Sequence, residues 1–262
     1  MTRILSALVL LPVVVGVIWF LPPAGTLALA AVASALAVYE YAGLASAMGV
    51  RIPRMLTGAG VLATCIVAAI PYGPVDVVLM CALLVIGAFT VSTGTPGPGL
   101  LRGIAVSMLP LIYIGLPLGA LAAIRLIGGR EALMLLLATI VISDTGQYYT
   151  GRALGRRPLA PSISPKKTIE GAIGGVVFGM AAMAIGGRLV FPAENVPVLL
   201  FVGAAVVGFG IAGDLFESLL KRSAGVKDSS ALIPGHGGIL DRIDSWLFAA
   251  PVFYVFIRFV QA

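Results

Sequence analysis

Long apolar runs, separated by short segments that hold proline, glycine or charged residues, cover most of this 262-residue chain. Hydrophobic residues make up 60% of the chain and charged residues only 11%, whereas soluble domains carry about 25% charged residues. So few polar groups could not cover the surface of a soluble protein, and a disordered chain would instead be poor in apolar residues. The sequence therefore predicts an integral membrane protein.

The apolar runs are typical of helices. A membrane-spanning helix needs about 20 apolar residues, whereas β-barrel strands alternate in polarity over about ten residues, and these runs are continuous. We therefore predict an all-α, polytopic protein with about nine transmembrane helices. The first run follows Arg3 and exceeds the apolar part of most signal peptides, so we expect an uncleaved helix. The runs are Ile4–Leu21, Thr26–Ala45, Met55–Ile70, Val75–Val91, Ile104–Ile124, Ala132–Tyr149, Gly171–Val190, Val196–Leu220 and Ser245–Val260.

The distribution of positive charge predicts the orientation. Nine crossings would put thirteen of the 17 Lys and Arg residues on the side of the N-terminus, which the positive-inside rule places in the cytoplasm. The net charge of +6 then reflects this bias and binding of anionic lipid or phosphate, and we expect no nucleic-acid partner. We expect the protein in the cytoplasmic (inner) membrane.

Acidic residues concentrate near the predicted cytoplasmic helix ends of the C-terminal half. A charge in mid-membrane costs about 2.5–3.5 kcal/mol on insertion scales, so a cluster indicates a functional site. We predict a cytoplasm-facing polar cleft in a catalytic region over 131–262, with 1–130 as a scaffold that makes dimer contacts. In the scaffold, Glu40 is interpreted as a packing or interfacial polar group. The clustered acids are Asp144, Glu170, Asp214, Glu217, Asp228, Asp241 and Asp244.

The end of the eighth run predicts a helix with one polar face. At 100° per residue, Asp214, Ser218 and Lys221 fall within one arc together with Glu217 and Arg222. This face is either the lining of a polar cleft or an amphipathic helix end stabilised by ion pairs four residues apart.

The following loop carries glycines that let backbone amides approach an anion. Asp241 and Asp244 are three residues apart, so both can face one point at the start of the last helix. Oxygen ligands of this kind suit Mg²⁺, which proteins hold with one or two carboxylates plus substrate phosphates. His236 lies in the loop and either caps it or contacts phosphate.

A third cluster belongs to the sixth run and its loop. Asp144 shares a helix face with Gln147 and Tyr148, and Ser164–Gly171 (SPKKTIEG) precedes the seventh run. Its cations and hydroxyls are either a positive-inside anchor for anionic lipid or an anion site at a helix N-terminus.

Together these residues resemble the membrane phosphatidate cytidylyltransferases, also called CDP-diacylglycerol synthases. The family's motif S-x-x-K-R-x₄-K-D, followed by P-x-H-G-G-x-x-D-R-x-D, is complete here. Upstream elements match at Ser143–Gly146 and Ser164–Gly171, with Gln147 where the family often has a small residue and Ile169 where it often has Trp. The motif residues are Ser218, Lys221, Arg222, Lys227, Asp228, Pro234, His236, Gly237, Gly238, Asp241, Arg242 and Asp244.

The resemblance implies transfer of the cytidylyl group of CTP to phosphatidate, with Mg²⁺, a monovalent cation such as K⁺, and a homodimer in the membrane. Bringing two polyanions together requires positioning and charge neutralisation, which the cations and carboxylates suit. The implied metal ligands are Asp214, Asp241 and Asp244. The implied catalytic residues are Ser218, Lys221, Arg222, Lys227 and His236. The implied substrate-binding residues are Asp144, Ser164, Lys166, Lys167, Thr168, Asp228 and Arg242.

Three alternatives remain open. Charges within the membrane also mark transporters and channels, although the N-terminal runs carry few charges and no inverted repeat is evident. A CDP-alcohol phosphotransferase would need Gly-x-x-Ala-Arg after the Asp-x-x-Asp pair, where this chain has Ser245 and Trp246. A CTP-using enzyme for another lipid phosphate, such as an ether-linked one, would carry the same motifs.

Overall fold

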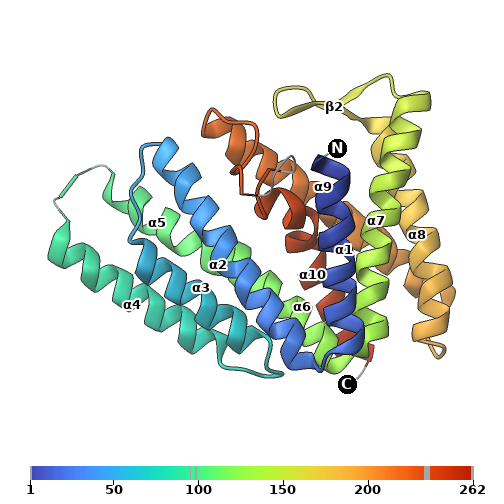
Figure 1. The fold of residues 1–262 in the computed structure, drawn as a ribbon, viewed down its shortest axis with the longest axis horizontal. Coiled ribbons are helices and arrows are strands. Elements are labelled where there is room, and N and C mark those ends of the chain that lie inside the picture. The colour runs from blue at the N-terminus through green and yellow to red at the C-terminus, as the bar shows by residue number, and fades with distance from the viewer. Residues whose placement is uncertain (1, 95, 98, 233–236, 261–262) are drawn as a thin grey trace. The chain divides into compact units, whose positions relative to one another are not determined.

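The structure is a computed structural model and describes residues 2–94, 96–97, 99–232 and 237–260. Helices make up most of it (Figure 1). The N-terminal elements are α1 (Thr2–Phe20), α2 (Pro23–Ala47), α3 (Arg54–Ala68), α4 (Val75–Thr93), α5 (Leu100–Pro110), the π-helical turn η1 (Leu111–Gly115) and α6 (Leu116–Ile127). The C-terminal elements are α7 (Gly129–Leu154), β1 (Pro158–Ala160), β2 (Ser164–Thr168), α8 (Ile169–Val190), α9 (Val196–Ser223) and α10 (Leu240–Val260).

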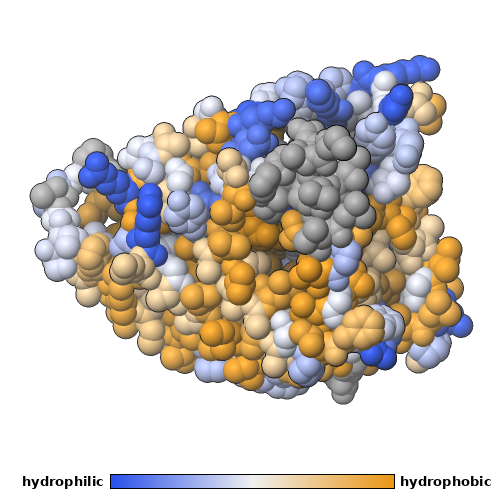
Figure 2. Space-filling model, viewed as in Figure 1, coloured by the Kyte–Doolittle hydropathy of each residue, from blue (hydrophilic) through white to orange (hydrophobic). Residues whose placement is uncertain are grey.

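Seven helices in the described part of the chain are long and apolar enough to cross a membrane. They include α4, whose side chains are largely exposed, and the continuous helix Leu100–Ile127. Figure 2 shows hydrophobic residues over much of the face in view. These findings support a polytopic helical membrane protein. The other two apolar helical stretches, Leu10–Phe20 and Arg54–Ala68, are shorter, so the count of nine crossings stays a prediction.

The connection between α7 and α8 departs from the all-α prediction. It forms an antiparallel hairpin in which Pro158 pairs with Thr168 and Ala160 with Ser164. Prolines at 158, 161 and 165 disfavour a helix here, since proline donates no backbone hydrogen bond and restricts the preceding residue to extended conformations. The basic loop predicted from sequence is therefore an ordered β-hairpin.

The chain folds into two compact units, each built from two separate stretches of sequence. Unit 1 comprises residues 1–126 and 220–242, and unit 2 comprises residues 127–219 and 243–262. The first boundary falls near the division predicted at residue 130, but the segment 220–242 groups with the N-terminal unit. The assignment of scaffold and catalytic roles to the two halves stays a prediction.

In unit 1, α3 packs against α2, α4 and η1. Glycines allow α3 to pack closely against η1 and α6. A Cβ atom on Gly119 would lie only 2.5 Å from the carbonyl oxygen of Cys65, and a Cβ atom on Gly115 only 2.9 Å from the carbonyl oxygen of Val61. Small residues at helix contacts are typical of membrane proteins, where van der Waals packing holds helices together. The π-turn lies between Pro110 and Pro117, neither of which can donate to the helix ladder.

In unit 2, α7 and α8 lie side by side along much of their length (Figure 1). The contact uses a glycine face of α8, because Gly174 and Gly175 are buried and a Cβ atom on either would collide with a side chain of α7. These side chains are Thr150 and Gln147. The glycine face therefore fixes the position of the α7 segment that also carries Asp144.

We expect Gly175→Ala to lower the stability of the protein by about 2 kcal/mol, because the added methyl group overpacks the contact with Gln147. Gly208→Ala in α9 is the matched control: nothing lies within 4 Å of its Cβ position, and alanine favours the helix by up to about 1 kcal/mol. Thermal unfolding in detergent measures both. Equal midpoints for the two variants would contradict the proposed packing.

Candidate active site

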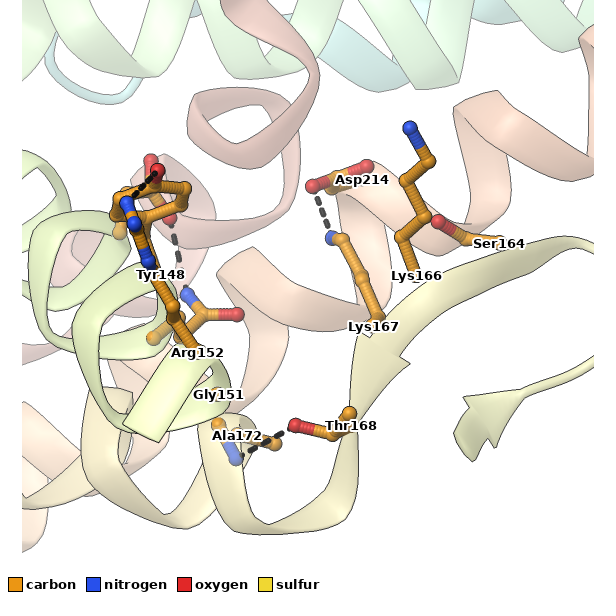
Figure 3. Close-up of a pocket in the computed structure, with 12 residues that line it drawn as sticks. Tyr148, Gly151, Arg152, Ser164, Lys166, Lys167, Thr168, Ala172 and Asp214 are labelled. Atoms are coloured by element: carbon orange, nitrogen blue, oxygen red, sulfur yellow. Dashed lines mark hydrogen bonds and ion pairs between the residues drawn. The ribbon is translucent and has the colours of Figure 1, made fainter. Parts of the chain in front are cut away.

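A cavity of about 660 Å³ lies in unit 2, between segments of α7, β2, α8 and α9 (Figure 3). Its lining combines cations, carboxylates, hydroxyls and glycines. The lining residues are Asp144, Gln147, Tyr148, Gly151, Arg152, Ser164, Lys166, Lys167, Thr168, Gly171, Ala172 and Asp214. Six of them are site residues predicted from the sequence: Asp144, Ser164, Lys166, Lys167, Thr168 and Asp214.

Charged side chains from three elements meet in this cavity. Lys167 of β2 forms an ion pair with Asp214 of α9, and the hydroxyl of Ser218 lies 3.5 Å from Oδ1 of Asp214. On α7, Nε2 of Gln147 donates to Oδ1 of Asp144 over 3.0 Å. Asp144 is near enough to interact electrostatically with both Asp214 and Lys167. The carboxylates of Asp144 and Asp214 thus share one cavity with the cationic side chains of Arg152, Lys166 and Lys167.

The N-terminus of α8 forms another part of the lining. Thr168 is its N-cap, and the Thr168 hydroxyl accepts a hydrogen bond from the backbone amide of Gly171 over 3.1 Å. Lys166 and Lys167 extend from the adjacent strand β2 (Figure 3). A helix N-terminus beside two lysines suits an anion, so the placement favours the anion-site interpretation over a lipid anchor alone.

Glu170 attaches the hairpin to this helix. Its Oε2 accepts from the backbone amides of Arg156 and Arg157 over 3.0 and 3.2 Å, and its Oε1 accepts from Nε of Arg157 over 3.1 Å. Glu170 belongs to the sequence element Ser164–Gly171, but the spacing of that element predicts no role for this carboxylate. Tertiary structure shows that this carboxylate fixes the start of the hairpin relative to the first turn of α8.

Unit 1 holds a second cluster around Asp241, at the start of α10. Its Oδ1 accepts from Nζ of Lys221 over 2.5 Å, and the two side chains are only 6% and 11% exposed. Its Oδ2 accepts from the amide and hydroxyl of Ser229 over 2.9 and 2.7 Å and from the amide of Gly238 over 2.8 Å. Asp241 therefore holds Lys221, Ser229 and Gly238 together at the start of α10.

Glu40 of α2 belongs to the same cluster. It is 1% exposed, and its carboxylate accepts hydrogen bonds from two serine hydroxyls and from two backbone amides. The donors are Ser229 (2.9 Å), Ser230 (2.8 Å), the amide of Ile239 (2.8 Å) and the amide of Leu240 (2.9 Å). The sequence predicted that Glu40 is a packing or interfacial polar group. In the structure, its serine partners lie about 190 residues later in the chain.

Other predicted residues lie on the surface of their units. Lys227, Asp228 and Arg242 are exposed, and the Arg222 guanidinium donates to the carbonyl oxygen of Val226 over 3.0 Å. In unit 2, Oδ1 of Asp244 accepts from the amide of Ser245 over 2.6 Å. His236 and Pro234, together with Ile233 and Gly235, lie outside the described residues.

The predicted metal ligands differ in how well they fit a cation. No group of three His, Cys, Asp or Glu side chains gathers as a metal site among residues 2–94, 96–97, 99–232 and 237–260. Asp241 already accepts four hydrogen bonds, which argues against direct coordination in this conformation. Asp214 faces the cavity, and a Cβ atom on its neighbour Gly213 would lie 2.6 Å from the carbonyl oxygen of Asp244. Asp214 and Asp244 thus lie on touching turns of α9 and α10, and carboxylates are ligands of the kind that Mg²⁺ takes.

The fold defines a polytopic helical membrane protein, and the cavity is lined by charged and polar side chains. A model of the cytidylyltransferase family matches residues 1–260, and the chain belongs to that family. This finding confirms the resemblance noted in the sequence.

Several curated relatives align with about half of the chain. The phosphatidate cytidylyltransferase of Haemophilus influenzae is 44% identical over 137 residues, which are 50% of this chain and 48% of that protein. The enzyme of the same name from Bacillus subtilis is 42% identical over 152 residues, 56% and 55% of the respective chains. The protein YnbB of Escherichia coli is 47% identical over 132 residues, 50% and 44% of the two chains. The chain thus spans about half the length of the curated relatives it matches.

Proposed function

We propose that the protein is a phosphatidate cytidylyltransferase, which converts CTP and phosphatidate to CDP-diacylglycerol and pyrophosphate for phospholipid biosynthesis. An oxygen of the phosphatidate phosphate attacks the α-phosphorus of CTP. The bond from this phosphorus to the oxygen that bridges the α- and β-phosphates breaks, and pyrophosphate leaves. The observation that carries the proposal is the cavity in which Lys166, Lys167 and the N-terminus of α8 lie with Asp144 and Asp214, in a chain of the cytidylyltransferase family.

The residues of this cavity match the demands of the reaction. A phosphomonoester is largely dianionic near pH 7, since its second pKa is about 6, so the nucleophile needs no strong base. The main barrier is repulsion between two polyanions, which cations and backbone amides lower by positioning the phosphates and neutralising charge. Lys166, Lys167 and the capped helix N-terminus would bind phosphate, while Ser164 and Thr168 supply hydroxyl donors.

The proposed cofactors are Mg²⁺ and a monovalent cation such as K⁺. Asp214 and Asp244 would hold Mg²⁺, which supplies charge neutralisation to the phosphates. The four hydrogen bonds of Asp241 favour a supporting role for this residue. Ser218, Lys221, Arg222, Lys227, Asp228, Arg242 and His236 stay proposed contacts of the triphosphate and the lipid phosphate.

The routes by which the substrates reach the site, and the oligomeric state of the protein, are also proposals. Apolar helices would give the diacyl chains lateral access from the bilayer, and CTP would enter from the cytoplasmic side of the inner membrane. We propose a homodimer as the assembly.

Transfer of radiolabel from [α-³²P]CTP into the lipid phase tests this function. Purified protein in detergent, with phosphatidate, Mg²⁺ and K⁺, is expected to form labelled CDP-diacylglycerol and one pyrophosphate per lipid labelled. Transfer to an ether-linked lipid phosphate but not to phosphatidate would identify a different acceptor. No transfer by folded, monodisperse protein would contradict the proposal and favour a transporter.

A further inference from the structure

The connection between α9 and α10 carries several residues of the motif. In unit 1, a carboxylate of α2 accepts hydrogen bonds from described residues on either side of 233–236. Glu40 lies in the middle of the N-terminal apolar region, yet its four hydrogen-bond donors all belong to residues 229–240. A charged group that is only 1% exposed is costly to transfer from water, and these four donors offset that cost. A purely local packing role would not require such a complete set of distant partners.

Two of the donors are the backbone amides of Ile239 and Leu240, at the N-terminus of α10. Helix N-termini leave backbone amides without partners inside the helix, and a carboxylate there also interacts favourably with the helix dipole. Glu40 therefore caps α10 from another helix. This cap fixes where the helix begins, and with it the position of Asp241 in the first turn.

Ser229 joins Glu40 to Asp241. Its hydroxyl lies 2.9 Å from Oε2 of Glu40 and 2.7 Å from Oδ2 of Asp241, so the two carboxylates share the one proton that this hydroxyl can donate. Gly238 lies within the same contact, because a Cβ atom there would come within 2.5 Å of Cδ of Glu40. Ser229–Ser230 and Gly238–Leu240 are thus both held by the carboxylates of Glu40 and Asp241. Lys227 and Asp228 immediately precede the first of these attachment points.

We propose that Glu40 is a positioning residue for the cytidylyltransferase reaction, which holds Ser229, Ser230 and the start of α10 in the arrangement that presents Lys227 and Asp228 to substrate. This inference rests on the proposed function. Glu40 is not proposed to touch substrate, because its carboxylate is buried and occupied by the segment itself. It acts through Ser229, Ser230 and the start of α10.

Glu40→Gln is the most informative variant, because it preserves the size of the side chain and replaces one accepting carboxylate oxygen with an NH₂ group that can only donate. Each carboxylate oxygen accepts from one backbone amide, so an amide NH₂ in place of either oxygen would face an N–H donor. The oxygen that remains can satisfy only one of the two amides. Asp76→Asn is the matched control, because Asp76 is an exposed acid at the first turn of α4 in the same unit.

Two measurements test the inference on the full chain in detergent. Hydrogen exchange of the peptide covering 226–242 is expected to quicken by about 10- to 100-fold in Glu40→Gln, as buried amides lose charged acceptors, and to stay unchanged in Asp76→Asn. Transfer from CTP to phosphatidate is expected to fall about 10- to 100-fold, mainly in kcat, because the groups that bind substrate remain but are misplaced.

A third variant separates positioning from loss of fold. Ser229→Ala is expected to lower kcat in the same direction, and the double variant with Glu40→Gln to lose less than the two single losses combined, because both act on one attachment point. Unchanged kcat in folded Glu40→Gln, or lost activity without faster exchange in 226–242, would overturn the inference. Absence of transfer by the native chain would refute the proposed function and with it the positioning role of Glu40, while faster exchange in Glu40→Gln would still show the attachment.

Discussion

Replacing Asp214 with asparagine is expected to reduce cytidylyl transfer by about 10²–10³-fold, comparable to removing one group that stabilises charge in a transition state. Asp214 lines the cavity, forms an ion pair with Lys167 and lies beside the hydroxyl of Ser218. The substitution removes a proposed Mg²⁺ ligand and also leaves Lys167 without its carboxylate. Initial rates at a series of Mg²⁺ concentrations measure the effect, and the variant should require more Mg²⁺ than the native chain.

Glu131→Gln is the matched control for this experiment. Glu131 belongs to the same unit, and its carboxylate pairs with Arg130 on the surface, where both side chains are about half exposed. Exposed ion pairs contribute little, so the rate should stay within about twofold of native. A native rate and Mg²⁺ requirement in Asp214→Asn would remove Asp214 from the proposed site.

Lys221→Met is expected to cost about 3–5 kcal/mol of stability, because it removes the cation from a buried ion pair. Lys221 Nζ lies 2.5 Å from Oδ1 of Asp241, and the two side chains are 11% and 6% exposed. The remaining donors from Ser229 and Gly238 do not neutralise the charge of Asp241. Thermal and denaturant unfolding in detergent, followed by circular dichroism, would measure the loss.

The double variant Lys221→Met/Asp241→Asn tests whether the loss comes from the pair. It should be more stable than the sum of the single effects predicts, because no uncompensated charge stays buried. Arg130→Met is the control for an exposed pair and should cost no more than about 1 kcal/mol. Additive losses from Lys221 and Asp241 would show that the pair is not coupled.

Several features of the fold follow from local sequence. The runs Gly171–Val190 and Val196–Leu220 predicted α8 (Ile169–Val190) and α9 (Val196–Ser223) to within three residues, because a membrane requires long apolar segments with satisfied backbone groups. Lys166, Lys167 and Thr168 were placed at a helix N-terminus by the same local pattern. The hairpin 158–168 was missed, since its few residues give no periodic signal.

Sequence by itself determined the class of protein, the main helices and the residues of the motif. Only tertiary structure decided which of these residues meet: Lys167 with Asp214, Lys221 with Asp241, and Glu40 with residues 229–240. Helix periodicity sorts side chains onto faces, but it does not say which face meets another when the partners lie 20 to 200 residues apart. In sequence, Glu40 looks like any other acid near a helix end, and Asp241 is a motif residue whose partners the motif does not name. Their burial and their hydrogen-bond donors, which arise from packing, distinguish them.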